Sequence, residues 1–279
     1  MTGYKNLREK LEKLFDDAGV DDYADIDWIM CEVLGKRRSE LAFVSEISVE
    51  DEAKIMNAAD KRMKHIPLGY IFGKTNFYGY DLMVNESVLI PRLDTEILIE
   101  TAIKEINSRE NATILDIGTG SGAIAIVLNK ETNAKTIAVD VSEKALEVAK
   151  QNAITNNAEV EFIHSNLFEN LGKIKVDFIV SNPPYIESSV IAGLDKEVRD
   201  NEPILALDGG EDGLDFYRVI VKEAKNHLNP NGMLLFEIGY NQGEALKELM
   251  KDGFKNVKVI KDYGNNDRVV IGELLWLKD

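Results

Sequence analysis

The stretch Leu115-Asp-Ile-Gly-Thr-Gly-Ser-Gly122 decides the fold class, because an apolar strand leads directly into a glycine-rich turn and then into a helix. Glycine adopts positive φ angles without a Cβ penalty, so these glycines let the backbone approach a ligand closely. Open α/β sheets bind their ligands at such carboxyl ends of strands. The stretch therefore predicts a nucleotide-binding turn, and a tight turn that only joins strand to helix is the simpler alternative.

Strands and helices alternate from Ala112 onward. Apolar runs predict strands at 113–117, 136–139, 160–163, 177–181, 233–238, 257–261 and 269–273, and helices around 122–130, 142–155, 213–228 and 241–251. This order predicts an α/β fold with a doubly wound, mostly parallel sheet and helices on both faces. The loop 262–267 is too short for a crossover helix, so the last two strands should pair antiparallel. A sheet of this kind is similar to that of class I methyltransferases.

The residues before this region predict a separate helical domain. From residue 4 to about 65, apolar residues recur at three- and four-residue spacings, as in amphipathic helices. Ser48 is placed to cap the third long helix, and Pro67 ends the pattern because proline lacks the backbone N–H. We therefore predict a small helical domain over residues 1–75, with no chemistry of its own.

A short segment separates the two predicted domains. Residues 76–90 alternate apolar and polar side chains around Gly79 and Asn85, which predicts a β-hairpin. We interpret this hairpin as a linker. The larger domain then occupies residues 91–279.

Composition and charge narrow the class of protein. The chain has 279 residues, of which 44% are hydrophobic and 29% are charged, as is typical of a globular protein. Its formal net charge of −16 repels nucleic-acid phosphates. Cys31 is the single cysteine, no apolar run is long enough to span a membrane, and the N-terminal residues do not resemble a signal peptide. We therefore expect a cytoplasmic protein without a membrane or nucleic-acid partner.

Two acids indicate which nucleotide the glycine-rich turn binds. The glycine spacing over 118–123 also satisfies the dinucleotide fingerprint, so an NAD enzyme is one alternative. Asp116 favours S-adenosylmethionine, because a carboxylate there suits a charged amino-acid portion and would repel a pyrophosphate. Asp140 ends the second strand and can accept hydrogen bonds from ribose hydroxyls, which both cofactors possess. Capping of the helix that begins near Ser142 is the alternative role for Asp140.

The tetrapeptide Asn182-Pro-Pro-Tyr185 indicates the chemistry. It follows a buried strand, so it should lie at the same edge of the sheet as the glycine-rich turn. A side-chain amide is a poor nucleophile because resonance occupies its nitrogen lone pair. The side-chain oxygen of Asn182 and the carbonyl of Pro183 can accept its two N–H bonds, and Tyr185 can pack against the flat amide. The pattern favours methyl transfer to a planar nitrogen over a plain turn.

This tetrapeptide is typical of amino-methyltransferases that act on DNA adenine, DNA cytosine or protein glutamine. Over nearly its whole length the chain resembles the peptide chain release factor glutamine methyltransferase (PrmC/HemK) family. The motifs that carry this resemblance are Pro67-Leu-Gly-Tyr70, Phe77-Tyr-Gly79, Ile90-Pro-Arg-Leu-Asp-Thr-Glu96, Asp116 to Gly122, Asn182 to Tyr185, Asn201-Glu-Pro203 with Ala206-Leu207, and Asp262-Tyr-Gly264 ahead of Arg268. The stretch 91–96 and the Asn-Glu-Pro loop are far more specific than the glycine-rich turn.

The resemblance implies transfer of a methyl group from S-adenosylmethionine to the N5 amide nitrogen of a glutamine in a release factor, leaving S-adenosylhomocysteine. The expected cofactor-binding residues are Asp116, Gly118, Thr119, Gly120, Ser121, Gly122, Asp140, Asn166, Leu167 and Asn182. The expected substrate-binding residues are Asn182, Pro183, Pro184 and Tyr185, of which Asn182, Pro183 and Tyr185 are expected to be catalytic. The helical domain is expected to recognise the release factor, and no metal is expected.

One position departs from the family pattern. Members usually have an acid followed by an aromatic residue against the adenine, whereas this chain has Asn166 and Leu167. An amide oxygen can still accept from the adenine amino group, but without the charge assistance of a carboxylate. Leucine can pack against the base without ring stacking.

Three alternatives stand beside this hypothesis. A ribosomal-protein glutamine could be the substrate, because the catalytic motifs are shared. A nucleic-acid adenine methyltransferase is disfavoured by the net charge and by the absence of a basic target-recognition domain. A nucleoside-binding protein without catalysis is disfavoured by the intact tetrapeptide.

Overall fold

The computed structural model describes residues 1–275 and divides into two compact units. The helical unit comprises Met1–Gly73 together with Asp195–Asn201. The sheet unit comprises Lys74–Leu194 and the chain from Glu202 onward. Each unit has its own buried core, and each is described by itself.

The helical unit is built from short amphipathic helices. They are α1 (Tyr4–Ala18), α2 (Ala24–Leu34), α3 (Arg38–Leu41), α4 (Val49–Met63), α5 (Leu68–Phe72) and α9 (Lys196–Asn201), with strands β1 (Thr2–Gly3) and β2 (Glu46–Ile47) paired antiparallel. Leu7, Leu11 and Phe15 of α1 are fully buried at helical spacing, which gives this unit its core. Ser48 caps α4, because its hydroxyl accepts the backbone N–H of Asp51 at 3.0 Å.

A segment distant in sequence completes the helical unit. Glu197 of α9 forms an ion pair with Arg62 at 2.8 Å, and Arg62 also contacts Asp25 at 2.5 Å. The Arg62 side chain is only 11% exposed, so its charge needs such acidic partners. The Asn201 amide nitrogen donates to the His65 carbonyl at 3.0 Å. The sequence predicted one uninterrupted domain from residue 91, whereas the structure groups α9 with the helical unit. Patterns in the sequence do not show this grouping, because it depends on contacts between residues far apart in the chain.

The sheet unit contains a seven-stranded sheet of order β10-β11-β9-β8-β5-β6-β7. The strands are β5 (Thr113–Ile117), β6 (Lys135–Asp140), β7 (Val160–His164), β8 (Val176–Ser181), β9 (Leu228–Glu237), β10 (Phe254–Lys261) and β11 (Asp267–Leu274). Strands β5 to β9 pair parallel, and β11 runs antiparallel between β9 and β10. This confirms the predicted doubly wound, mostly parallel sheet and its antiparallel last strand. The strand order reverses between β5 and β8, which is where such sheets bind ligands.

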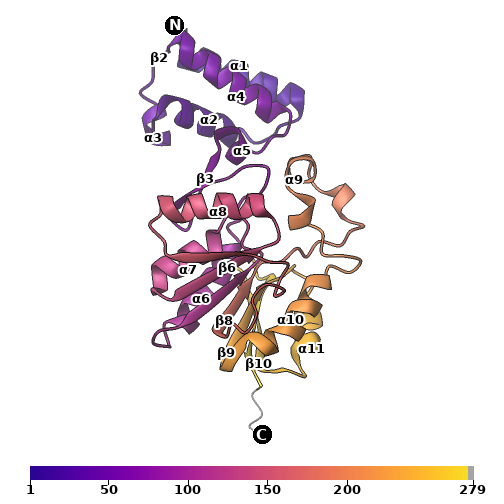
Figure 1. Ribbon diagram of the computed structural model, residues 1–279. Coiled ribbons are helices and arrows are strands. Elements are labelled where there is room, and N and C mark those ends of the chain that lie inside the picture. Colours follow the sequence, from indigo (N-terminus) through magenta and orange to yellow (C-terminus); the bar gives the residue numbers. More distant parts are fainter. Residues whose placement is uncertain (276–279) are drawn as a thin grey trace. The chain divides into compact units, whose positions relative to one another are not determined.

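Helices cover both faces of this sheet (Figure 1). The helices of the sheet unit are α6 (Thr95–Ile106), α7 (Ala123–Thr132), α8 (Glu143–Thr155), α10 (Asp215–His227) and α11 (Gly243–Met250), with short 3-10 turns at Ile191–Gly193 and Ile204–Ala206. Leu115 and Ile117 pack into the core beneath α10 and α11, while Ile114 packs into the core beneath α6 and α7. This alternation follows from the two-residue period of a strand that is buried on both faces.

The hairpin belongs to the sheet unit. Strands β3 (Lys74–Phe77) and β4 (Tyr80–Met83) pair antiparallel around a turn with positive φ at Tyr78 and Gly79. The side-chain amide of Asn152 in α8 bonds both the N–H and the carbonyl of Met83, at 2.6 and 2.9 Å. The hairpin expected at 76–90 thus lies at 74–83, and the residues that follow it form an irregular segment beside the pocket described below.

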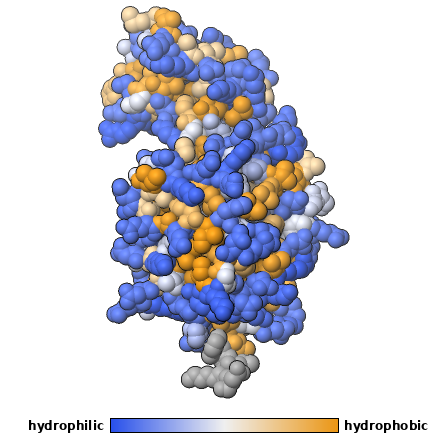
Figure 2. Space-filling view, viewed as in Figure 1, coloured by the Kyte–Doolittle hydropathy of each residue, from blue (hydrophilic) through white to orange (hydrophobic). Residues whose placement is uncertain are grey.

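The visible surface of the sheet unit is mostly hydrophilic. Figure 2 shows that hydrophilic side chains cover most of the visible face of the sheet unit, with apolar side chains gathered in its middle. None of the helices in residues 1–275 is both long enough and apolar enough to cross a membrane.

Candidate active site

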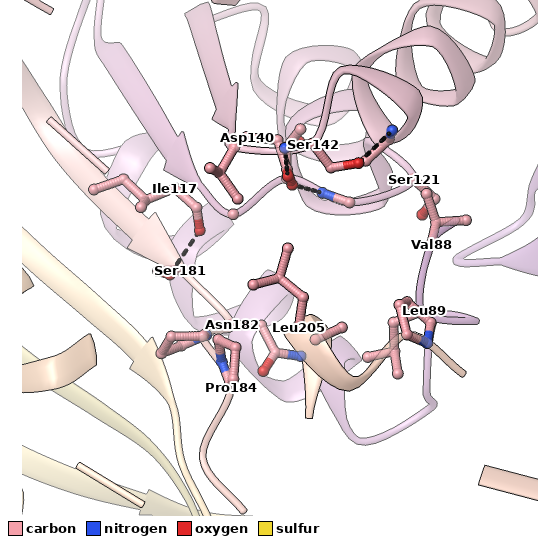
Figure 3. A pocket seen from close by; sticks show the side chains of 18 of the residues that line it. Val88, Leu89, Ile117, Ser121, Asp140, Ser142, Ser181, Asn182, Pro184 and Leu205 are labelled. Carbon is pink, nitrogen blue, oxygen red and sulfur yellow. Dashed lines mark hydrogen bonds between the residues drawn. The ribbon is translucent and has the colours of Figure 1, made fainter. Parts of the chain in front are cut away.

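A pocket of about 530 Å³ opens in the sheet unit at the carboxyl ends of β5, β6 and β8. It brings together most of the residues that the sequence predicted for the site: Gly118, Thr119, Gly120, Ser121, Asp140, Asn166, Leu167, Asn182, Pro183 and Pro184. Figure 3 shows Asp140 and Ser142 on one side of this space and Asn182 with Pro184 on the other. Asp116, Gly122 and Tyr185 are not among the residues that line the pocket. Their surroundings are described one by one below.

Asp140 holds the glycine-rich turn. Its Oδ2 accepts the N–H of Gly120 at 2.9 Å, and its Oδ1 accepts the N–H of Ser142 at 2.9 Å (Figure 3). Ser142 in turn caps α8 by accepting the N–H of Ala145. A carboxylate has about four lone-pair sites, so each oxygen of Asp140 keeps acceptor capacity toward the pocket. The two roles that the sequence left open for Asp140, capping and hydroxyl binding, are therefore compatible.

Asp116 lies beneath the turn and is fully buried. The hydroxyl of Thr119 donates to its Oδ2 at 2.6 Å, and no cation pairs with it among residues 1–275. Burial raises the pKa of Asp116 to about 7. The Asp116 carboxyl is therefore buried, and its hydrogen-bond partner Thr119 lines the pocket.

Asp116 is expected to make the fold less stable as the pH rises. Because its pKa is raised from 3.8 to about 7, the folded state keeps a proton that the unfolded state releases between these values. Its stabilising contribution is complete below about pH 4 and is lost as the pH rises through about 7. Asp116→Asn cannot ionise, so the variant should lack this loss. Urea unfolding midpoints from pH 5 to 8 test this, and parallel curves for the two proteins would contradict it.

Gly122 packs helices together. Its φ is +82°, and a Cβ at this position would lie 3.1 Å from the Ala149 Cβ and 3.2 Å from the Ile126 Cδ1. Any larger residue would push α7 away from α8 and strain the backbone. The third glycine of the turn therefore serves helix packing, while Gly118 and Gly120 lie at the pocket.

The tetrapeptide is anchored on both sides. The Ser181 hydroxyl donates to the Ile117 carbonyl at 2.7 Å, which ties the end of β8 to β5. The Asn182 amide nitrogen donates to the hydroxyl of Thr95 at 3.3 Å, so its oxygen is left as an acceptor. Tyr185 is mostly buried, and its hydroxyl donates to Oε1 of Glu237 at 3.3 Å. Burial, with the nearby Glu237 carboxylate, raises the pKa of Tyr185, so this hydroxyl stays protonated.

The pocket wall near residues 166 and 167 keeps an amide acceptor. The Asn166 amide nitrogen donates to the Glu169 carboxylate at 2.9 Å. The amide oxygen of Asn166 can therefore act as a hydrogen-bond acceptor. Leu167 adopts a φ of +49°, an unusual value for a residue with a Cβ. Both residues line the pocket.

Several pocket residues were not identified from the sequence as binding residues. They are Glu86, Val88, Leu89, Pro91, Arg92, Thr95, Pro203, Leu205, Ala206 and Phe216. Arg92 donates to both carboxylate oxygens of Glu202 at 2.7 Å, and Glu202 is 4% exposed. This pair joins two walls of the pocket. The sequence showed Arg92 in the Pro-Arg stretch and Glu202 in the Asn-Glu-Pro loop. It did not show that these two side chains, 110 residues apart, form a pair.

Among residues 1–275, no three His, Cys, Asp or Glu side chains gather in a way that could hold a metal ion.

Comparison with known proteins identifies the family. Residues 6–73 match the family model of the PrmC N-terminal domain, and residues 93–194 match that of the methyltransferase small domain. A release factor glutamine methyltransferase of Fusobacterium nucleatum is 43% identical over 256 residues, covering 89% of this chain and 72% of the relative. That of Geobacter sulfurreducens is 41% identical, covering 90% of this chain and 89% of the relative. The chain belongs to the release factor glutamine methyltransferase family.

Solved structures agree with this family in fold. A methyltransferase from Pyrococcus furiosus is 25% identical with a TM-score of 0.55, covering 71% of this chain and 90% of that one. A 16S rRNA N2 G1207 methyltransferase of T. thermophilus has a TM-score of 0.54 at 18% identity, covering 72% of this chain and 49% of that one. The class I methyltransferase fold predicted from the sequence is confirmed, and so is the predicted family.

Proposed function

We propose that this chain transfers a methyl group from S-adenosylmethionine to the N5 nitrogen of a glutamine side chain in a class I peptide chain release factor. The observation that carries the proposal is the meeting, in one pocket, of the glycine-rich turn, Asp140 and the Asn-Pro-Pro segment. The relatives named release factor glutamine methyltransferase supply the partner. The site of action that we propose is the cytoplasm, where the lone free Cys31 stays reduced.

The pocket residues suit S-adenosylmethionine. Asp140 offers carboxylate acceptors suited to ribose hydroxyls, and the N–H of Gly120 that it accepts holds the turn in place. Asn166 offers an amide oxygen and Leu167 an apolar surface, as an adenine needs. When bound, the cofactor supplies an electrophilic methyl group on a sulfonium.

The chain's own residues position the glutamine. The Asn182 oxygen can accept one N–H of the glutamine amide, because its nitrogen is already engaged with Thr95. The backbone carbonyl of Pro183 is the proposed second acceptor. Holding both N–H bonds fixes the nitrogen in line with the methyl carbon, and such positioning is worth several kcal/mol of barrier. A strong base is unnecessary if the proton leaves after the methyl group has transferred.

The test of this function is direct. The protein is incubated with isotopically labelled S-adenosylmethionine and, in separate reactions, with a release factor, a ribosomal protein and DNA. Mass spectrometry then locates the label. We expect label on one glutamine of the release factor. Label on the ribosomal protein alone, on DNA adenine, or on no partner would overturn the proposal.

We propose in addition that the helical unit recognises the protein partner. The supporting observation is that all the residues lining the pocket belong to the sheet unit, so the helical unit contributes none of them. Trp28 and Phe43 of the helical unit are 43% and 88% exposed, so both aromatic side chains are accessible to a protein partner.

Replacing both aromatic residues tests partner recognition. The double variant Trp28→Ala, Phe43→Ala should raise KM for an intact release factor and leave KM for a short glutamine-containing peptide unchanged. Equal effects on both substrates would contradict the role. A deletion of residues 1–75 is a weaker test, because it would also leave Asp195–Asn201 without the rest of its unit.

A further inference from the structure

A buried side-chain amide is bonded to the backbone of the tetrapeptide. Gln242 directly precedes α11 and is 7% exposed. Its nitrogen donates to the Tyr185 carbonyl at 3.1 Å and to the Gly213 carbonyl at 3.2 Å, and its oxygen accepts the N–H of Gly239 at 2.9 Å. Neither Gln242 nor Tyr185 is among the residues that line the pocket. One side chain therefore joins three segments of the sheet unit that are far apart in sequence.

The three hydrogen bonds fix the direction in which this amide faces. A backbone carbonyl can only accept a hydrogen bond, and a backbone N–H can only donate one. The nitrogen of Gln242 must therefore face the two carbonyls, and its oxygen must face Gly239. Both N–H groups of the amide are engaged, so Gln242 holds the Tyr185 carbonyl in one position.

Two glycines bring a second segment against the tetrapeptide. A Cβ at Gly209 would lie 2.8 Å from the Pro184 carbonyl oxygen and 2.8 Å from the Tyr185 Cα, and a Cβ at Gly213 would overlap the Tyr185 carbonyl oxygen. The carbonyl of the next residue, Ile186, accepts the Gly209 N–H at 2.8 Å. Because glycine has no side chain, this segment can pack directly on the backbone that Gln242 holds.

The two prolines make the tetrapeptide depend on such contacts. Proline has no N–H to donate and its ring fixes φ, so a displacement at one end of the Pro-Pro pair is passed on to the other end. The Pro183 carbonyl is the proposed acceptor for the second N–H of the glutamine. Figure 3 shows Asn182 and Pro184 at the pocket, so the segment meets the pocket at one end and Gln242 at the other. The position of the Pro183 carbonyl therefore depends on where the Tyr185 carbonyl is held.

We propose that Gln242 is a positioning residue for methyl transfer, which holds the Tyr185 carbonyl and thereby keeps the Pro183 carbonyl in place for the glutamine amide. The inference rests on the proposed glutamine chemistry. It adds a residue that lies outside the pocket lining and acts through the backbone of the tetrapeptide.

Gln242→Glu tests the donor at nearly constant shape. The ionised carboxylate can only accept hydrogen bonds, so it repels the two carbonyls that the amide nitrogen binds, whereas the protonated carboxyl regains one O–H donor. Burial and the two carbonyls should raise the pKa of this carboxyl, so the loss should lessen as the pH falls. We expect kcat roughly tenfold below that of the wild type at pH 8 and within about threefold at pH 6, with KM for S-adenosylmethionine within about twofold at both.

Two further variants separate positioning from folding. Gln242→Met has no donor in any protonation state, so its kcat should fall by a similar factor at every pH. Asn129→Asp is the matched control, because the Asn129 nitrogen also donates to two carbonyls, those of Ala134 and Glu159, and its oxygen accepts the Glu159 N–H. Asn129 lies beside the amino ends of β6 and β7, away from the pocket. Its variant should keep the wild-type kcat, counted per molecule that binds S-adenosylhomocysteine.

Several outcomes would overturn the inference. They are a wild-type kcat in Gln242→Met, a loss in Gln242→Glu that stays constant from pH 6 to pH 8, and an equal fall of kcat in Asn129→Asp. Loss of S-adenosylhomocysteine binding in both Gln242 variants would also overturn it, because the residue would then hold the sheet unit as a whole. Failure of the proposed function is recognised separately, since the wild-type protein would then leave the release factor glutamine unmethylated.

Discussion

Asn182→Ala is expected to lower the rate of methyl transfer by about 100-fold or more, the usual cost of losing one aligned positioning contact. Alanine removes the oxygen that accepts the glutamine N–H, and the substrate amide can then rotate out of line with the methyl carbon. The cofactor is expected to lie mainly against the glycine-rich turn and Asp140, so its affinity should change little. Single-turnover methylation of a release factor measures the rate, and calorimetry with S-adenosylhomocysteine measures the affinity.

Asn182→Asp separates the acceptor from the donor at this position. The carboxylate keeps an acceptor for the substrate but has no N–H to donate to Thr95, a bond that measures 3.3 Å in the structure. We expect a rate between those of the wild type and Asn182→Ala. A wild-type rate in Asn182→Ala would mean that the tetrapeptide is only a turn, and the catalytic role would be withdrawn.

Asp140→Ala is expected to weaken binding of S-adenosylhomocysteine on the order of 10- to 100-fold. Hydrogen bonds to a charged group contribute about 1.5–3 kcal/mol each. The variant loses the proposed ribose acceptors and also releases the N–H groups of Gly120 and Ser142. Calorimetry measures the affinity, and NAD should show no binding to either protein.

An analogue without ribose hydroxyls distinguishes these two losses. If Asp140 binds the hydroxyls, the wild type should bind S-adenosylhomocysteine more tightly than the analogue, and Asp140→Ala should bind both alike. If Asp140 only holds the turn, the wild type should not discriminate between them. That second result would remove Asp140 from the cofactor site while keeping it as a residue of the fold.

The order of strands and helices was predictable from the sequence because it depends on local periodicity. Apolar runs such as Thr113–Ile117 are strand-sized, and the glycine-rich turn needs positive φ at Gly118 and Gly120, where only glycine is free of strain. The short loop before β11 required an antiparallel pair, and the structure contains one. The residues at the carboxyl ends of β5, β6 and β8 meet in one pocket because parallel strands align these ends.

Two expected site residues lie outside the pocket lining, because the direction in which a side chain faces is not visible in the sequence. Asp116 and Tyr185 were expected at the pocket from their positions beside the motifs. Alternation along β5 turns the Asp116 carboxyl into the interior, and Tyr185 is directed toward Glu237. The alternation of side chains along a strand can be read from the sequence. Which of the two faces of the strand is directed toward a ligand depends on how the rest of the chain packs against the sheet.

What the sequence alone determined, therefore, is the family, the sheet and the edge of the sheet at which the pocket lies, since these follow from local patterns and short motifs. The tertiary structure decided which distant residues meet: Arg92 with Glu202, Glu197 with Arg62, and Tyr185 with Glu237. The physical reason is that hydrogen bonds and ion pairs require atoms within about 3 Å. Distances of that kind, between residues that can be 110 positions apart or more, are set by the packing of the core.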